Sequence, residues 1–364
     1  MSSSTALARV VRARTSSMIG RLAMVGVIVA GVGLAFAYTG GWLTPQALTP
    51  SRLVDTFEQV DGIYPGFRRN HAKGVCVSGY FDSNGQATRL SRASVFQPGR
   101  IAVEGRFALA GGLPYASDTP QTVRSLALRF ILSGGEEWRT AMINIPVFPA
   151  STPAVFRAQL VAMAPDPTTG NPDPVKVQAF LAQNPASARA IATIRAQKIA
   201  SGFENAAYYA LNAFEFIDAG GHATPVRWSV IPLQPFAEAG PAAPPNAPNY
   251  LFDALIARMH QQPLRWRLIV TIGQSGDPTN DATIVWPAER EQLEAGTLTL
   301  DGIASEDDSP VRTVNFDPLV LPDGIAASDD PLLSARSAAY SVSFTRRVGE
   351  PESPSAVSPQ EVAR

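Results

Sequence analysis

The sequence predicts an α+β fold in which a closed antiparallel β-barrel carries an inserted helical layer and follows one transmembrane helix. Residues of alternating polarity occur in two groups along the chain, a pattern typical of half-buried antiparallel strands. Segments that open with a helix-capping residue and proline separate the two groups. An uncharged apolar run near the N-terminus approaches the ~20 residues that span a bilayer.

The N-terminal segment predicts a membrane anchor. Residues 1–21 contain four arginines, and residues 22–43 contain no charged side chain. Because basic residues stay on the cytoplasmic side, we expect a single-pass protein of a bacterial inner membrane, with the rest of the chain in the periplasm. A cleaved signal peptide is the alternative. The apolar run is longer than a usual signal core and has no separate cleavage site, which favours the uncleaved anchor.

The first group of strands follows a short linker at residues 40–50. Alternation predicts strands at residues 74–81, 100–109 and 125–132. The third is the clearest, because its alternate residues, three leucines and a phenylalanine, face one way. We therefore expect a sheet that is covered on one face.

Helices follow, and then a second group of strands. One helical region starts at Pro153, and the pairs Asp173–Pro174 and Asn184–Pro185 each place a capping residue before a proline that suits the first helical turn. The last of these helices is expected to end near Ala200. An amphipathic face that begins at Leu251 predicts another helix. Further strands are predicted at residues 213–218, 225–231, 266–272 and 297–300.

Composition limits the function classes. The chain has 364 residues, of which 45% are hydrophobic, enough for one large domain or two ordinary ones. Its 30 basic and 31 acidic residues give a net charge of −1, so no nucleic acid partner is expected. The single cysteine, Cys76, excludes an internal disulfide and a thiolate metal cluster. Cys76 lies in an alternating run, and we interpret it as a small packed residue rather than a catalytic thiol.

Arg336 and Tyr340 are the most informative pair of residues. They lie in residues 333–347, which contain no proline or glycine and favour a helix, and positions i and i+4 of a helix share a face. A guanidinium beside a phenol favours the phenolate. A tyrosinate is one of the few protein groups that ligate ferric haem. The alternative is a surface arginine beside a half-buried tyrosine, and these two residues alone do not exclude it.

The segment before this helix favours the haem interpretation. Residues 314–333 contain Phe-Asp-Pro, then Pro-x-Gly-Ile, then Ser-x-Asp, and Arg-x-x-x-Tyr follows. This order and spacing closely resemble the segment that leads into the proximal haem helix of catalases. The resemblance implies that Tyr340 is the ligand of the haem iron and that Arg336 accompanies it.

A second motif resembles the distal side of the same family. Residues 67–81 contain Arg-x-x-His-Ala-Lys-Gly followed by Gly-Tyr-Phe, as catalases do. His71 corresponds to the catalytic distal histidine. Arg68 corresponds to an arginine that contacts a haem propionate.

The resemblance extends from about residue 51 to residue 347. It implies that Arg106 binds the second propionate and that Phe156 packs over the haem. It also implies an eight-stranded barrel with inserted and C-terminal helices, which together form a domain at residues 51–348 that holds one haem b. The remaining residues, 349–364, lack periodicity and are expected to be disordered.

Two departures from the family pattern concern the distal side. Catalases place two asparagines before Thr-Pro, and the first is catalytic. Here Ile143 takes the first position and Asn144 the second, so either Asn144 takes over this role or the distal amide is missing. Ala108 replaces a serine that is hydrogen-bonded to the distal histidine in catalases, so His71 is expected to be oriented less firmly.

The chain resembles the shortened catalase-related peroxidases. The expected function is reduction of hydrogen peroxide and organic hydroperoxides with an external electron donor, with His71 as the general acid–base. One alternative is a catalase-fold enzyme that rearranges lipid hydroperoxides, and another is a haem-binding protein without activity. The sequence leaves open the donor, the preferred peroxide, residual catalase activity and whether the protein is an oligomer.

Overall fold

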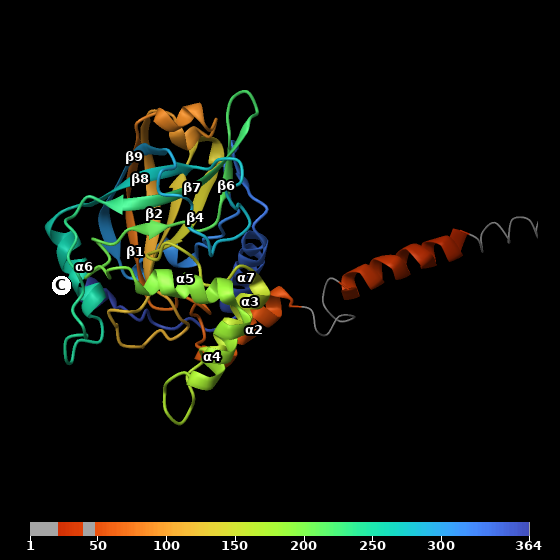
Figure 1. The fold of residues 1–364 in the computed structure, drawn as a ribbon, viewed down its shortest axis with the longest axis horizontal. Coiled ribbons are helices and arrows are strands. Elements are labelled where there is room, and N and C mark those ends of the chain that lie inside the picture. Colours follow the sequence, from red (N-terminus) through yellow and green to blue (C-terminus); the bar gives the residue numbers. More distant parts are fainter. Residues whose placement is uncertain (1–20, 39–47, 364) are drawn as a thin grey trace, which may run out of the picture. The chain divides into compact units, whose positions relative to one another are not determined.

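The computed structural model describes residues 21–38 and 48–363 and divides the chain into two units, residues 1–49 and 50–364. In the first unit, the helix Arg21–Tyr38 is long and apolar enough to cross a membrane, and a signal sequence passes the same test (Figure 1). The expected basic N-terminus before Arg21 and the end of the expected anchor, residues 39–43, lie outside the described residues.

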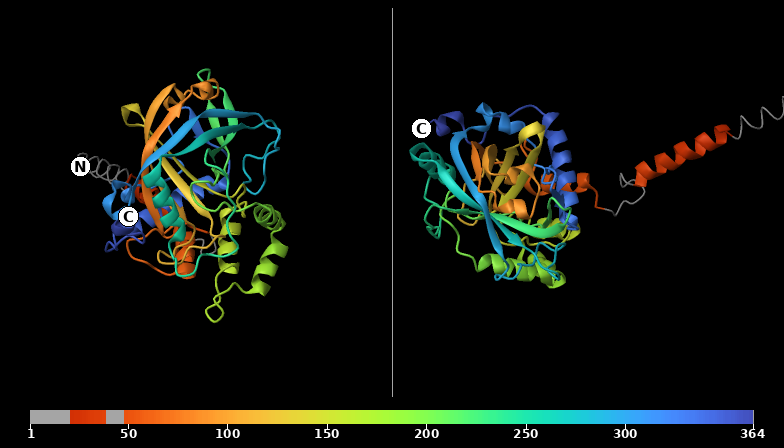
Figure 2. Two further views of the ribbon diagram at one scale, coloured as in Figure 1. Left: turned by 90° about the vertical axis from the view of Figure 1, so that its left-hand side faces the viewer. Right: turned by 90° about the horizontal axis from the view of Figure 1, so that it is seen from above.

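The second unit is built around a closed barrel of eight antiparallel strands (Figures 1 and 2). Going round the barrel, the order is β7-β5-β4-β3-β2-β1-β9-β8, and β8 pairs with β7 to close it. The short strands β6 and β10 extend the sheet beside β7. The bounds are β1 Gly74–Ser83, β2 Gly99–Leu109, β3 Arg124–Ile131, β4 Glu137–Ile143, β5 Tyr208–Tyr209, β6 Phe214–Ile217, β7 Ala223–Pro232, β8 Leu264–Ile272, β9 Gln292–Ala304 and β10 Ile325–Ala327. The predicted eight-stranded barrel is confirmed.

Aromatic side chains fill the inside of the barrel. Phe107, Phe130, Trp138 and Trp266 are all fully buried. The rings of Phe130 and Trp138 stack with their centroids 4.7 Å apart, and those of Phe107 and Trp266 are 5.9 Å apart. Small barrels of this size are filled by their own side chains. The interior is thus a packed core, and a ligand has to bind elsewhere.

Asp173–Pro174 begins a helix as predicted, and Pro185 begins the next one, but the side chain of Asn184 makes no capping hydrogen bond. The caps Thr152, Asp173 and Asp330 each accept a hydrogen bond from a backbone N–H of the first turn, and a proline follows each cap. The bounds are α2 Pro50–Asp61, α3 Pro153–Ala162, α4 Pro174–Gln183, α5 Pro185–Arg195, α6 Tyr250–Gln261, α7 Pro331–Val348 and α8 Pro359–Val362. Helix α5 ends at Arg195, earlier than expected.

Three helices from distant parts of the unit pack together outside the barrel. The rings of Phe57 in α2 and Phe156 in α3 lie 5.9 Å apart. Arg346 of α7 forms ion pairs with Asp55 and Glu58 of α2, at 2.6 and 2.8 Å. The first and the last long helix of the unit therefore form one wall, and α3 to α5, in yellow-green, gather on one side of the barrel (Figures 1 and 2).

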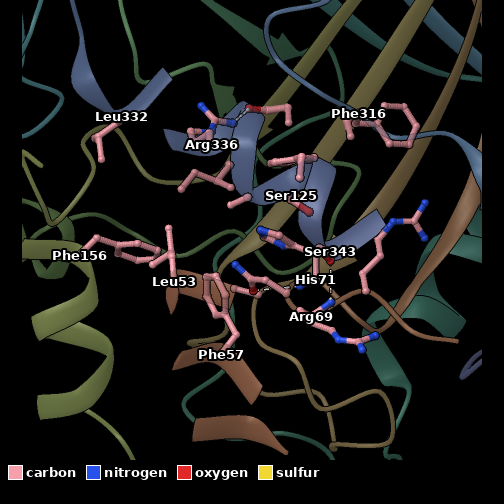
Figure 3. A pocket seen from close by; sticks show the side chains of 18 of the residues that line it. Leu53, Phe57, Arg69, His71, Ser125, Phe156, Phe316, Leu332, Arg336 and Ser343 are labelled. Carbon is pink, nitrogen blue, oxygen red and sulfur yellow. Dashed lines mark hydrogen bonds between the residues drawn. The ribbon is translucent and has the colours of Figure 1, made fainter. Parts of the chain in front are cut away.

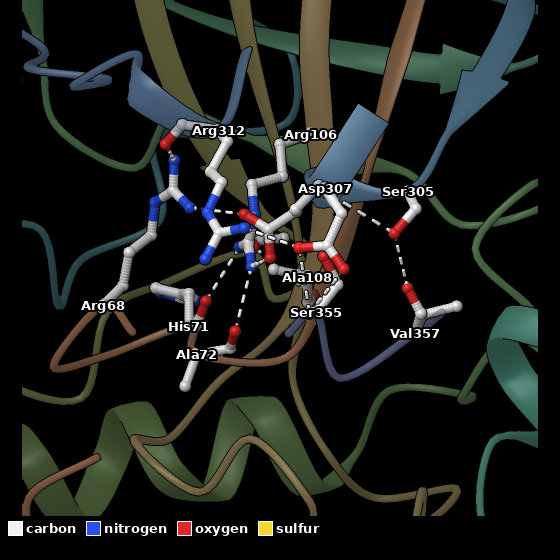
Figure 4. Close-up of polar contacts among 12 residues, drawn as sticks. Arg68, His71, Ala72, Arg106, Ala108, Ser305, Asp307, Arg312, Ser355 and Val357 are labelled. Atoms are coloured by element: carbon white, nitrogen blue, oxygen red, sulfur yellow. Dashed lines mark hydrogen bonds and ion pairs between the residues drawn. The ribbon is translucent and has the colours of Figure 1, made fainter. Parts of the chain in front are cut away.

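The expected disorder of residues 349–364 is wrong for the described part of this segment. Val357 and Val362 are buried in the main core, and α8 forms at the end of the segment. The Ser305 hydroxyl donates to the carbonyl oxygen of Val357 at 2.8 Å (Figure 4). The segment lacks periodicity because single valines and backbone hydrogen bonds, rather than a regular element, attach it to the barrel.

Candidate functional site

A cavity of about 510 Å³ lies against the outer wall of the barrel. Its walls come from β3 and β4 of the barrel and from α2, α3 and α7, and apolar side chains such as Leu53, Phe57 and Phe156 make up most of its surface (Figure 3). Six of the seven site residues predicted from the sequence line this cavity: Arg68, His71, Arg106, Phe156, Arg336 and Tyr340. The seventh, Asn144, is not among the described lining residues.

His71 lies in the connection that precedes β1. Its φ of 57° is in the left-handed region, which non-glycine residues rarely adopt and which is often found at functional sites. Burial lowers the pKa of His71 to about 3, and the nearby charges of Arg106 and Arg336 act in the same direction. The imidazole is therefore neutral at physiological pH, the form that accepts a proton. Its Nδ1 is buried and has no described hydrogen-bond partner.

The methyl side chain of Ala108 offers no hydrogen-bonding group to Nδ1. Ala108 lies on β2, directly opposite Ser125 of β3. The Ser125 hydroxyl lines the cavity but donates to the carbonyl oxygen of Ala108 at 3.3 Å. No described side chain therefore fixes the ring of His71 through Nδ1.

Helix α7 brings Arg336 and Tyr340 to the cavity, one turn apart. Arg336 donates from Nη1 to the side-chain oxygen of Asn212 and from Nη2 to the carbonyl oxygen of Ala141, the latter at 3.2 Å. Asn212 in turn donates to the carboxylate of Asp330, the N-cap of α7, at 2.8 Å. The guanidinium of Arg336 is thus held between the barrel wall and the start of its own helix.

Arg68 and Arg106 share one buried carboxylate that the sequence analysis did not identify. Glu306 accepts from Arg68 at 2.6 Å and from two nitrogens of Arg106 at 2.9 Å each. Burial alone would raise the pKa of Glu306, but the two guanidiniums outweigh it and hold the pKa at about 2. Arg106 also donates to the carbonyl oxygens of His71 and Ala72, at 2.8 and 3.1 Å (Figure 4).

Arg347 is a third arginine of this cluster, and it was not predicted from the sequence either. It lies seven residues after Tyr340, which is two helical turns, and it lines the same cavity. Burial lowers the pKa of Arg347 to about 9, and repulsion from Arg68 contributes. With Arg68, Arg106 and Arg347 against Glu306, this corner of the cavity carries an excess of two positive charges.

Ile143 lines the cavity, whereas Asn144, whose amide catalysis would need there, is not among the described lining residues. The Oδ1 atom of Asn144 accepts a hydrogen bond from the backbone N–H of Arg124 at 2.8 Å, which ties Asn144 to the start of β3. The role of Asn144 stays a prediction.

Together these groups define what the cavity can bind. A volume of about 510 Å³ lies within the ~300–1,000 Å³ range of small-molecule and cofactor pockets. Apolar walls, a cationic corner and a phenol oxygen suit a large apolar ring with two carboxylates and a metal ion. Among the described residues, no group of three or more His, Cys, Asp or Glu side chains could hold a metal ion.

Sequence comparisons find relatives that are matched over almost their whole length. The family described as Catalase matches residues 44–353. A "Catalase-related peroxidase" of Synechococcus elongatus is 37% identical over 324 residues, which cover 88% of this chain and 94% of that protein. One of Mycolicibacterium paratuberculosis is 32% identical over 305 residues, covering 83% and 96%.

Solved structures agree on the fold. A fungal catalase superposes with a TM-score of 0.71 at 20% identity, and the match covers 83% of this chain and 64% of the catalase. Catalase A of Saccharomyces cerevisiae gives 0.70 at 19% identity, covering 83% and 65%. The chain therefore spans slightly less than two thirds of these structures.

Proposed function

The chain belongs to the catalase family and is an oxidoreductase that acts on peroxide, and from this premise we propose that it is a haem peroxidase. The proposed reaction is reduction of hydrogen peroxide and organic hydroperoxides by an external electron donor. The observation that carries the proposal is that His71 and Tyr340, from opposite ends of the sequence, line one cavity with an apolar wall and a cationic corner.

Haem b is the group that the described residues fit. Tyr340 would supply the iron ligand, with Arg336 beside it on α7, and Phe156 would pack against the ring. The excess of two positive charges among Arg68, Arg106, Arg347 and Glu306 matches the two propionates of haem b. When bound, haem b supplies the redox chemistry that cleaves the O–O bond.

His71 performs the proton transfer in this proposal. A hydroperoxide carries its acidic proton on one oxygen and loses the other oxygen as water or an alcohol, so a proton has to move between them. The neutral imidazole of His71 accepts the first proton and returns it to the leaving oxygen, which is general acid–base catalysis. Apolar residues around His71, such as Leu53 and Phe57, exclude bulk water from this exchange.

The apolar N-terminal helix favours a second candidate, rearrangement of lipid hydroperoxides. The helix Arg21–Tyr38 is long and apolar enough to cross a membrane, and as an anchor it would keep the enzyme close to lipid substrates. The two candidates differ in electron balance. A peroxidase oxidises donor in proportion to the alcohol formed, whereas a rearrangement yields an isomer of the hydroperoxide and consumes no donor.

We also propose that the N-terminal helix anchors the enzyme in a bacterial inner membrane with the haem domain in the periplasm. The helix Arg21–Tyr38 has 18 residues and a mean hydropathy of 1.9. The arginines in residues 1–21 support the cytoplasmic side for the N-terminus.

Replacement of His71 tests the proposed function. His71→Ala should lower donor-dependent peroxide turnover by about 10²–10⁴-fold, the usual loss for a missing general acid–base, while haem remains bound. Steady-state assays with an organic donor and the haem absorption of the same samples measure both quantities.

Cys76→Ser is the matched control for a thiol-based mechanism. Cys76 is buried, and burial raises its pKa to about 11, so it carries no reactive thiolate at neutral pH. Its replacement should leave turnover within a fewfold of the wild type. Activity that is lost in Cys76→Ser but retained in His71→Ala would indicate a thiol-based peroxidase mechanism instead.

A further inference from the structure

Asn70, the residue before His71, presents an unused hydrogen-bond donor to the cavity. Asn70 is one of the lining residues. Its Oδ1 atom accepts from the backbone N–H of His71 at 2.9 Å and from that of Gly111 at 2.8 Å. Because two donors need the oxygen, the amide can take only one orientation. Its Nδ2 atom has no acceptor among the described residues, so both amide hydrogens are available to a ligand.

The other uncharged polar side chains around the cavity are engaged or belong to the opposite side. Asn212 is bound at both ends, by Arg336 and by Asp330. The Ser125 hydroxyl donates to a backbone carbonyl oxygen. The Ser343 hydroxyl, on α7, accepts from the backbone N–H of Arg69 and keeps its own O–H as a donor. Asn315 lies in the segment whose Val314 and Phe316 pack with Tyr340, on the side of α7. Among the described residues, Asn70 is thus the free side-chain amide donor adjacent to His71 in sequence, and the Ser343 hydroxyl comes from α7.

In the described structure, Asn144 does not supply a second amide to the cavity. Its oxygen is tied to the N–H of Arg124, and it is Ile143 that reaches the cavity wall. An amide that faces the ligand beside the imidazole therefore comes from the residue before His71, not from the end of β4.

We propose that Asn70 is a catalytic residue, whose Nδ2–H donates a hydrogen bond to the peroxide oxygen from which His71 removes the proton. This inference rests on the proposed function. As the proton leaves, negative charge develops on that oxygen, and a fixed donor stabilises it without reorganisation of solvent. A neutral amide is suited to this role because it donates but does not compete with His71 for the proton. The contact involves only the O–O group, so it serves hydrogen peroxide and organic hydroperoxides alike.

Fluoride binding to the haem-loaded full-length protein tests the proposal without relying on turnover. Bound fluoride accepts hydrogen bonds and undergoes no reaction, and its affinity is read from the haem absorption. Asn70→Leu keeps the size and removes the whole amide, both the Nδ2 donor and the oxygen that accepts from the N–H groups of His71 and Gly111. It should weaken fluoride binding about tenfold or more, the loss expected for a hydrogen bond to a charged acceptor. Asn205→Leu is the matched control, because Asn205 also accepts a backbone N–H but does not line the cavity.

The outcomes separate the inference from the function on which it rests. Weaker binding in Asn70→Leu, with Asn205→Leu within about twofold of the wild type, supports the assignment. Unchanged binding in Asn70→Leu, or a loss in Asn144→Leu instead, overturns it and leaves the peroxidase proposal intact. A wild-type protein that binds no haem defeats the proposed function itself.

A crystal structure of the wild-type fluoride complex covers the case in which Asn70→Leu does not fold. Nδ2 of Asn70 should lie within about 3.2 Å of the fluoride ion. A complex in which another residue or a water molecule occupies that place would overturn the assignment.

Discussion

Glu306 compensates part of the positive charge of the arginine cluster. Its side chain is only 6% exposed and lies between Arg68 and Arg106. Without it, these arginines and Arg347 would place three uncompensated cations in a partly buried corner. Removing one partner of a buried ion pair costs far more than the intact pair contributes, because the remaining charges stay desolvated.

Glu306→Gln should therefore lower the free energy of unfolding of the haem-free protein at neutral pH by about 3–5 kcal/mol. The folded pKa of about 2 lies below the ordinary value of 4.5, so the ionised carboxylate stabilises the fold above pH 4.5. That contribution is lost as the pH falls from 4.5 towards 2. Urea unfolding at several pH values should show a smaller loss in the variant than in the wild type over this range.

Glu291→Gln controls for the change of side chain, because Glu291 forms an exposed pair with Arg89 and such pairs contribute little. Identical pH profiles for Glu306→Gln and the wild type would show that the carboxylate does not stabilise the arginine cluster.

The cluster also shows how far the sequence could predict the site. Arg68 and Arg106 were identifiable because each lies within a short motif that resembles a family pattern. Glu306 lies in a 3₁₀ turn after β9 with no such motif, and only the folded chain brings it to the arginines. Arg347 was within reach, because a spacing of seven residues from Tyr340 places it on the same helix face.

Among the elements, α7 carries Arg336 and Tyr340 to the cavity, and contacts at its N-terminus hold it in place. Asp330 accepts from the N–H of Leu332 at 2.9 Å and from the amide of Asn212 at 2.8 Å. Asn212 also accepts from Arg336. One cap residue thus ties the helix that carries Tyr340 to the segment before β6, and sets both the start and the rotation of that helix.

Asp330→Ala should cost about 2 kcal/mol in unfolding free energy, from loss of the cap and of the buried hydrogen bond to Asn212. It should also reduce the haem bound per protein, because α7 loses its fixed position. Asp173→Ala is the control: it removes an equivalent cap from α4 and should cost about 1 kcal/mol with no change in haem content. Equal haem content in the two variants would contradict the positioning role of Asp330.

Strand prediction succeeded where alternation is regular and failed where it is not. Residues 125–132 alternate without interruption, and β3 spans Arg124–Ile131. The predicted strand at 297–300 is only the centre of β9, Gln292–Ala304, because the pairing of β9 shifts at Leu268/Ile269 of β8 and at Ser78/Gly79 of β1. Such bulges place an extra residue in one strand and break the period of two that sequence analysis detects.

At the scale of the whole molecule, the packed barrel is a scaffold and its outer wall holds the site. The aromatic core leaves the ligand cavity to the space between β3, β4 and the helices α2, α3 and α7. Helix α2 lines the cavity with Leu53 and Phe57. It is also the first element of the second unit along the chain, after the apolar N-terminal helix.

A reporter that is active only in the periplasm, fused after Arg364, should be active in a bacterial host. The arginines of residues 1–21 and the uncharged run at residues 22–43 predict this orientation. The same fusion without residues 1–43 should be inactive, because nothing then directs the domain across the membrane. Activity of a reporter that works only in the cytoplasm, in the same full-length fusion, would show that the C-terminus lies in the cytoplasm and contradict the proposed topology.

The central claim is that Tyr340 ligates the iron of a haem held in the cavity. The most direct measurement is the absorption spectrum and haem-to-protein ratio of Tyr340→Phe, which removes only the phenol oxygen. Tyr80→Phe is the control, since Tyr80 also lies beside an arginine, with the guanidinium of Arg100 3.7 Å from its ring centroid, but does not line the cavity. Tyr340→Phe should show a lost or altered haem spectrum, and Tyr80→Phe should show the wild-type spectrum. A wild-type spectrum and full haem content in Tyr340→Phe would contradict the central claim.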